Sequence, residues 1–137
     1  HYSIVTMGFY DSLGPQAEAY MVQETLVQTI FISASFFDKL IKQKKDGNME
    51  SLRNVVVFED LTDDQKQAAD EADLKLYSFN DVLEVGKEHA DLEFEEPTPE
   101  MVYGLSYTSG TTGDPKGVKS THQGLLSTVK TLPDTMD

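Results

Sequence analysis

The pentapeptide Asn54-Val55-Val56-Val57-Phe58 is the clearest strand in the sequence. It is a continuous run of apolar, mostly β-branched residues rather than an alternation of apolar and polar ones. Such a run is typical of a strand in a sheet that is covered on both faces. Sheets covered on both faces are usually parallel, with helices as the cover. This stretch therefore predicts a parallel strand inside an α/β fold.

Strand-like runs and segments of helical spacing alternate on both sides of this stretch. The other strands expected before residue 91 are 3–9, 29–33 and 74–77. The expected helices are one opening at Leu13-Gly14-Pro15, one carrying Phe37, Leu40, Ile41 and Lys44, one at 62–73, and one capped by Ser78 or Asn80 that runs to about His89. This βαβα order predicts an α/β fold, with a layered, mostly parallel sheet and flanking helices.

A segment rich in glycines and hydroxyl side chains lies near the end of the chain, at Tyr107–Val118. It joins an expected strand at 102–108 to an expected returning strand at 117–121, which together would form a hairpin. Glycines let backbone N–H groups turn toward a ligand, hydroxyls add donors, and Lys116 adds a positive charge, so the segment favours a phosphate-bearing ligand. The candidate binding residues are Thr108, Ser109, Gly110, Thr111, Thr112, Gly113 and Lys116, of which Lys116 is also the candidate catalytic residue.

This segment has two other possible interpretations. A Walker A loop needs glycine directly before its lysine and serine or threonine directly after it, and Pro115 and Gly117 occupy those places. The segment is therefore a different kind of phosphate loop. A glycine- and threonine-rich hairpin connection that binds no ligand is the remaining alternative.

The residues from Tyr107 to Gly117 resemble the signature loop of the adenylate-forming superfamily, the ligases that make acyl- and aminoacyl-AMP. That loop runs aromatic-Thr-Ser-Gly-Thr-Thr-Gly-x-Pro-Lys-Gly, and this chain matches every fixed position, with Asp114 in the variable one. The resemblance implies that residues 1–137 are part of the large N-terminal, AMP-binding domain of such an enzyme. It also implies that 107–118 is the phosphate-binding loop of that domain.

Other stretches are similar to the long-chain acyl-CoA synthetases of that superfamily. Tyr10–Gly14 reads Tyr-Asp-Ser-Leu-Gly, close to the Tyr-Asp-Thr-Leu-Gly of those enzymes. The helix-like 79–87, the acidic, proline-containing linker at 91–100 and Thr121-His122 are similar as well. The chain departs from the pattern at Met7-Gly8-Phe9, Lys119-Ser120 and Gly124.

This resemblance implies a long-chain fatty acid–CoA ligase, in which fatty acid, ATP and coenzyme A give acyl-CoA, AMP and pyrophosphate. A carboxylate attacks the α-phosphate, so positioning and charge neutralisation carry the step, and Lys116 would offset charge on the leaving phosphates. Mg²⁺ would accompany ATP, bound mainly by phosphate oxygens and water. Since the chain begins at His1 rather than Met, we expect an internal fragment. The resemblance implies that the adenine, magnesium and acyl sites lie mostly beyond Asp137, so we expect this fragment to be inactive alone. The resemblance implies an intracellular location, in the cytosol or on the cytosolic face of a membrane such as the endoplasmic reticulum.

Two alternative functions stay open at this point. The first is another adenylate-forming enzyme, such as a short- or medium-chain acyl-CoA, coumarate-type or peptide-synthetase adenylation domain. The second is a non-catalytic nucleotide-binding module, because a loop can bind phosphate without driving its transfer.

The composition narrows the partners. The formal charge is −13, from 11 basic and 24 acidic residues, which argues against nucleic acid as a partner. The acidic runs at 59–73 and 81–100 are expected to be solvated surface. There is no cysteine, and the scattered His1, His89 and His122 give no metal site. No apolar run approaches the roughly 18 to 20 residues of a membrane-spanning helix.

The remaining expectations concern single side chains. A last helix is expected to start near Thr121 and to turn Leu125, Leu126 and Val129 inward. Turn and core roles are expected for Tyr10 and Asp11, a solvent-facing turn position for Asp114, and a contribution to an acyl or nucleotide pocket is a candidate role for His122.

Overall fold

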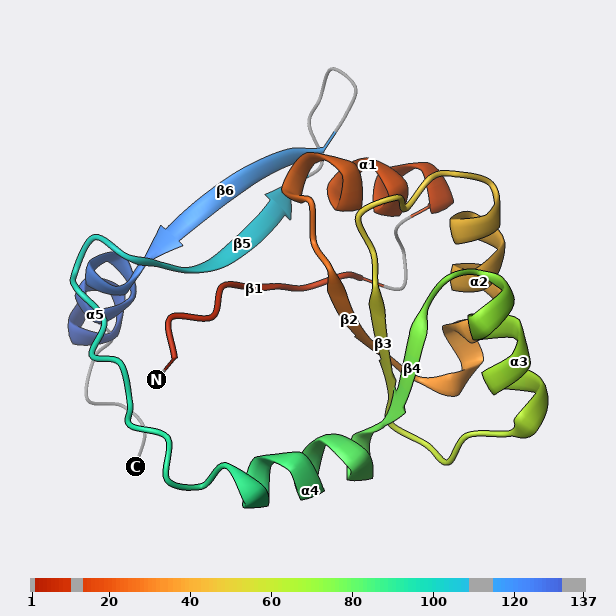
Figure 1. The fold of residues 1–137 in the computed structure, drawn as a ribbon. Coiled ribbons are helices and arrows are strands. Elements are labelled where there is room, and N and C mark those ends of the chain that lie inside the picture. Colours follow the sequence, from red (N-terminus) through yellow and green to blue (C-terminus); the bar gives the residue numbers. More distant parts are fainter. Residues whose placement is uncertain (1, 11–13, 109–114, 132–137) are drawn as a thin grey trace, which may run out of the picture. The chain divides into compact units, whose positions relative to one another are not determined.

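The computed structural model describes residues 2–10, 14–108 and 115–131, which form two compact units. The middle of the chain, Leu13–Asp91, makes one unit, and the two ends, His1–Ser12 and Leu92–Asp137, make the other. Each unit has its own three-stranded sheet (Figure 1). The predicted α/β class, with parallel strands and flanking helices, is confirmed, although the strands divide between two sheets.

The middle unit is built on a parallel sheet of β2 (Thr29–Ile32), β3 (Asn54–Val57) and β4 (Lys75–Ser78), in that order. β3 is central, and Val55, Val56 and Val57 are all buried. The covered parallel strand that the apolar run predicts is therefore confirmed. Its two neighbouring strands are also confirmed: β2 ends one residue earlier than expected, and β4 is shifted by one residue toward the C-terminus.

Four α-helices and a 3-10 turn accompany this sheet. They are α1 (Pro15–Thr25), the turn η1 (Ala34–Phe36), α2 (Phe37–Lys45), α3 (Asp63–Glu71) and α4 (Phe79–Glu88). In Figure 1, α2 and α3 lie next to each other on one side of the sheet, and α3 also contacts β4. The largest fully buried side chains are Phe37, Met21, Met49, Leu52 and Val22, with two of the strand valines. All four expected helices are confirmed.

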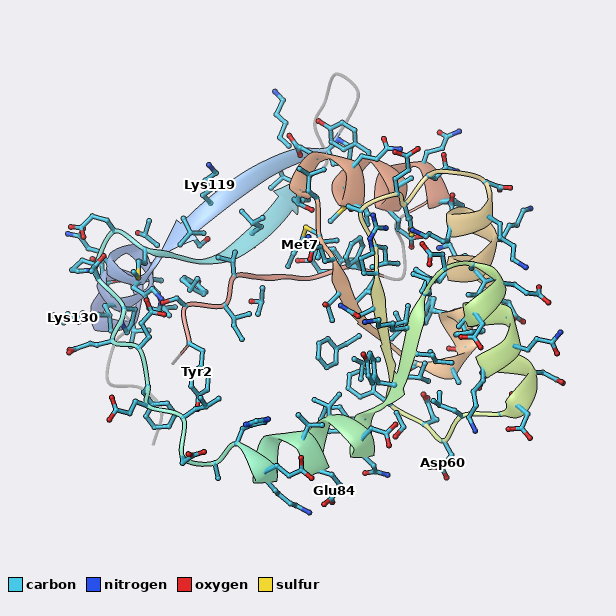
Figure 2. The ribbon with its side chains drawn as sticks, in the orientation of Figure 1. Tyr2, Met7, Asp60, Glu84, Lys119 and Lys130 are labelled. Atoms are coloured by element: carbon cyan, nitrogen blue, oxygen red, sulfur yellow. The ribbon has the colours of Figure 1, made fainter. Side chains whose placement is uncertain are left out.

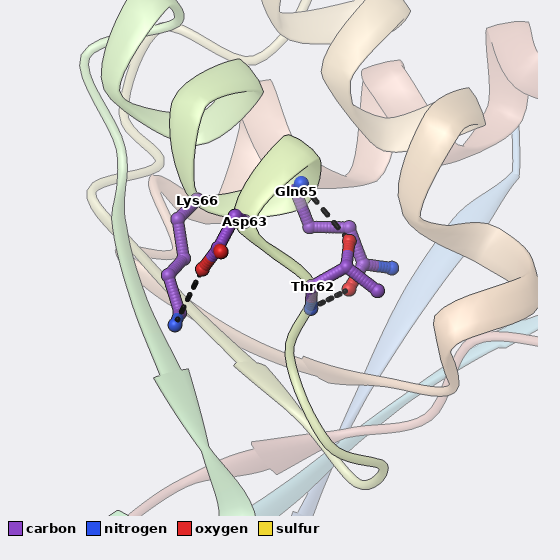
Figure 3. A network of polar contacts seen from close by, with 4 residues as sticks. All are labelled: Thr62, Asp63, Gln65 and Lys66. Carbon is purple, nitrogen blue, oxygen red and sulfur yellow. Dashed lines mark hydrogen bonds and ion pairs between the residues drawn. The ribbon is translucent and has the colours of Figure 1, made fainter.

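The starts of these helices follow from local sequence. Gly14 is extended and is followed by Pro15 at the first helical position, where the missing N–H of proline costs nothing. Thr62 opens α3 with a reciprocal capping box, in which the Gln65 N–H donates to Thr62 Oγ1 at 3.2 Å and the Thr62 N–H donates to Gln65 Oε1 at 3.0 Å (Figure 3). Ser78 opens α4 in the same way with Asp81, so Ser78 and not Asn80 is the cap.

The second unit contains β1 (Thr6–Met7), β5 (Val102–Thr108), β6 (Lys116–Thr121) and α5 (His122–Thr131). β5 is the central strand of the sheet β1-β5-β6, parallel to β1 and antiparallel to β6. The predicted hairpin of 102–108 and 117–121 is therefore confirmed. The strand expected at 3–9 shrinks to Thr6–Met7, and Ser3, with a φ of 54°, already departs from extended backbone.

Two expectations about burial are wrong. On α5, Leu125, Leu126 and Val129 are 41 to 58% exposed, because α5 contacts mainly β6 and the described residues of its unit leave these side chains uncovered. Tyr10 is also exposed and has no core role, whereas Asp11 lies outside the described residues. The expected solvation of the acidic runs is confirmed, since every aspartate and glutamate in 59–73 and 81–100 is exposed.

Candidate functional site

The β5–β6 hairpin brings two of the candidate residues together. Thr108 and Lys116 are directly opposite each other, as the last pair of the ladder before the intervening segment. Tyr107 pairs with Gly117 one step further in, and Ser106 pairs with Val118 after that. The other candidates, Ser109, Gly110, Thr111, Thr112 and Gly113, and also Asp114, lie outside the described residues.

Thr108 and Lys116 share one face of the hairpin. Side chains of directly opposite residues in an antiparallel pair point to the same face, with Cβ atoms about 4.5 to 5.5 Å apart. Both residues are exposed, so a hydroxyl donor and an ammonium group can reach the same ligand. Lys119, which extends from β6 in Figure 2, pairs with Leu105 and belongs to the opposite face because successive strand residues alternate.

Within the described residues, Lys116 forms no ion pair with a carboxylate. The ion pairs there join Lys39 to Glu18, Lys45 to Glu71, Lys66 to Asp63 and Lys87 to Glu84. An exposed lysine that has no carboxylate partner among these residues, and that lies beside a threonine hydroxyl, suits an anionic ligand that supplies the missing charge. This donor set fits phosphate oxygens.

On the other face of the hairpin, the end of the Tyr107 ring lies close to Gly117. A Cβ at Gly117 would lie 3.1 Å from Cζ of this ring, 3.3 Å from its hydroxyl oxygen and 3.4 Å from Cε1. Tyr107 itself is only 9% exposed. Sequence reasoning considered Gly110 and Gly113 and missed the role of Gly117. The signal lies in the hairpin register, which the structure gives and which places this glycine opposite an aromatic residue.

The far end of the hairpin is closed by backbone contacts at the start of α5. The N–H groups of His122 and Gln123 donate to the carbonyls of Met101 and Pro99, at 3.0 and 2.9 Å. The Gly124 N–H donates to Thr121 Oγ1 at 3.2 Å, which caps the helix. These donors are occupied by protein acceptors, so this helix start offers them to no anion. The half-buried His122 also places its ring at the edge of Tyr103, with centroids 5.6 Å apart.

A magnesium ion at this hairpin would need most of its ligands from groups other than protein side chains. Among residues 2–10, 14–108 and 115–131, no group of three or more histidine, cysteine, aspartate or glutamate side chains could hold a metal. Mg²⁺ bound with ATP is coordinated mainly by phosphate oxygens and water, which is compatible with a site made of Thr108 and Lys116. In the same part of the chain, no helix has the length and apolar character needed to cross a membrane.

Comparison with known proteins places this hairpin in a family. The family model described as "AMP-binding enzyme" matches residues 1–137. The chain is 36% identical to long chain acyl-CoA synthetase 6, peroxisomal, of Arabidopsis thaliana over 93% of its own length and 18% of that protein. It is 30% identical to fatty acyl-CoA synthetase B of Dictyostelium discoideum over 96% of its length and 20% of that protein.

A solved structure shows the same fold. The anthranilate CoA ligase AuaEII, crystallised with anthranoyl-AMP, superposes with a TM-score of 0.71 over 92% of this chain and 22% of that one, at 24% identity. The chain thus spans about a fifth of the length of the curated relatives it matches. Because the family model covers every residue, the chain belongs to the family of AMP-binding enzymes, whose members form adenylates.

Proposed function

We propose that the protein containing this chain is a long-chain fatty acid–CoA ligase. It activates a fatty acid with ATP to an acyl-AMP and then transfers the acyl group to coenzyme A, releasing AMP and pyrophosphate. Similarity to proteins named as long-chain acyl-CoA synthetases, at 28 to 36% identity over most of this chain, supports the substrate class. The observation that carries the proposal is the pairing of Thr108 with Lys116 on one exposed face of the hairpin, inside a family match.

The first half-reaction is a substitution at the α-phosphorus of ATP. A carboxylate oxygen of the fatty acid forms a bond to this phosphorus, and the bond from phosphorus to the bridging oxygen of the β-phosphate breaks. Negative charge then accumulates on the leaving pyrophosphate. Lys116 offsets this charge, and the Thr108 hydroxyl donates a hydrogen bond to a phosphate oxygen. Bound Mg²⁺ would supply further charge neutralisation on the same phosphates.

In the second half-reaction the thiol of coenzyme A attacks the acyl carbonyl, and AMP leaves as the acyl–oxygen bond breaks. Neither the acyl chain nor coenzyme A is assigned a site on the described residues. Recognition of the acyl chain and of coenzyme A is therefore proposed for the whole protein, because this chain spans only about a fifth of the length of its relatives.

A substrate panel tests this proposal on the complete natural protein. With ATP, coenzyme A and palmitate, we expect stoichiometric AMP, pyrophosphate and palmitoyl-CoA. Activity with acetate, coumarate or an amino acid but none with palmitate would remove the long-chain assignment and leave the adenylating one. ATP binding without pyrophosphate from any acid would favour the non-catalytic nucleotide-binding module instead.

A further inference from the structure

We propose that Tyr107 is a positioning residue, whose ring holds the backbone of Gly117 and thereby fixes the adjacent Lys116. This inference rests on the proposed function, because it concerns the lysine of the same phosphate site. The three atoms nearest to a Cβ at Gly117 are Cε1, Cζ and the hydroxyl oxygen of Tyr107, all at the outer end of its side chain. The ring therefore reaches across to β6 and occupies the space that a side chain at 117 would need.

The two strands of the hairpin differ in how firmly they are held. β5 pairs with β6 along its length and also with β1 at Gly104 and Leu105, whereas among the described residues β6 pairs with β5 alone, and Lys116 is its first residue. A strand end with one neighbour frays more easily than a central strand, and glycine after Lys116 adds backbone freedom. A buried ring on β5 counteracts both effects, because it packs on β6 one residue from Lys116.

Gly117 is needed for this contact rather than for an unusual backbone. The positive-φ glycine among the described residues is Gly47, so the conformation of Gly117 is open to any residue. A Cβ at 117 would press on the ring at 3.1 Å, and the ring would have to shift by a few tenths of an ångström. Tyr107 has little room to shift because it is 9% exposed.

Gly104 provides a matched control in the same hairpin. A Cβ at Gly104 would lie 3.6 Å from the carbonyl oxygen of Thr6 and 4.0 Å from its hydroxyl, which is ordinary van der Waals contact. Gly104→Ala and Gly117→Ala thus make the same chemical change in one hairpin, and only the second presses on Tyr107.

The test is a double-mutant cycle on the complete natural protein, read by palmitate-dependent ATP–pyrophosphate exchange. Gly117→Ala and Tyr107→Leu should each lower kcat about tenfold or more, whereas Gly104→Ala should stay within about twofold of wild type. Tyr107→Phe, which keeps the ring carbons, should restore most of the activity that Tyr107→Leu loses. The double variant Tyr107→Leu/Gly117→Ala should lose less than the product of the two single losses, because the added methyl group then meets no ring.

Deuterium uptake of the backbone separates this inference from the proposed function. Tyr107→Leu should speed uptake at 115–118 and leave the middle unit unchanged. Unchanged uptake at 115–118, or a Gly117→Ala variant as active as Gly104→Ala, would overturn the positioning role even in a fully active protein. A wild-type protein that catalyses no exchange with any acid would overturn the proposed function, while the uptake data would still judge the ring contact.

Discussion

The Tyr107 side chain ends over Gly117, its partner across the β5–β6 hairpin, with the nearest ring atom 3.1 Å from where a Cβ would stand. One step along the ladder, Thr108 and Lys116 face the other way and are exposed. The hairpin thus has two faces with different tasks. One packs a ring against backbone, and the other presents a hydroxyl and an ammonium group to solvent.

Thr108→Val should weaken ATP binding about tenfold to a hundredfold, because valine keeps the branched shape but removes a hydroxyl that hydrogen-bonds to a charged phosphate oxygen. The measurement is the Kd for ATP by calorimetry. Ser106→Ala is the control, since Ser106 lies on the same face two residues further from the loop. Equal losses in the two variants would show that the hydroxyl of Thr108 has no special contact with the nucleotide.

Lys44→Met should destabilise the middle unit by about 1 to 3 kcal/mol, the cost of leaving part-buried acceptors without a donor. The Lys44 ammonium donates to the carbonyls of Met49, Glu50 and Leu52, at 3.2, 3.3 and 2.8 Å. Burial, and then the nearby charge of Arg53, lower the pKa of Lys44, so holding this charge has a cost that the carbonyls offset. Urea denaturation checks the prediction. Lys42 lies in the same helix and is exposed. Lys42→Met should therefore change the free energy of unfolding by less than about 0.5 kcal/mol.

Asp81→Asn should make the stability of the protein less sensitive to acid. Hydrogen bonds from the Ser78 backbone and side chain lower the pKa of Asp81 below its ordinary 3.8. The pKa of Asp81 is lower in the folded protein than in the unfolded chain. The charged cap therefore contributes its full stabilisation above the unfolded-state pKa, and this stabilisation is lost as the pH falls through the folded-state pKa. The free energy of unfolding, measured by urea denaturation, should differ less between wild type and Asp81→Asn near pH 3 than at pH 7. Asp64 lies in the first turn of α3 but outside its capping box. Asp64→Asn should therefore alter the acid sensitivity of the stability less than Asp81→Asn does.

The elements that sequence predicts well are those governed by neighbouring residues. The strand Asn54–Val57, with its buried valines, and the helices that start after Thr62 and Ser78 depend on local composition and spacing, although the sequence left Ser78 and Asn80 open as the cap of the second helix. The β5–β6 hairpin was likewise implied by two strands joined through a short glycine-rich segment, whereas its register comes from the structure.

The features that sequence reasoning missed depend on contacts between distant residues. The division into two sheets requires β1 to pair with β5 across almost a hundred residues, which no local pattern encodes. The apolar spacing on α5 suggested burial of Leu125, but the described part of its unit provides no surface to cover it. The need for glycine at 117 comes from one ring on the opposite strand.

The most direct test of the account compares Lys116→Ala with Lys119→Ala in the complete natural protein, by ATP–pyrophosphate exchange with palmitate. Both changes remove an exposed lysine from β6, but only Lys116 shares a face with Thr108. We predict that Lys116→Ala slows exchange about 100- to 1000-fold, the range for losing a charge-stabilising donor, with an unchanged melting temperature. Lys119→Ala should stay within about threefold of wild type. Wild-type exchange in Lys116→Ala at the same melting temperature would contradict the account, because the hairpin would then not handle the leaving phosphates.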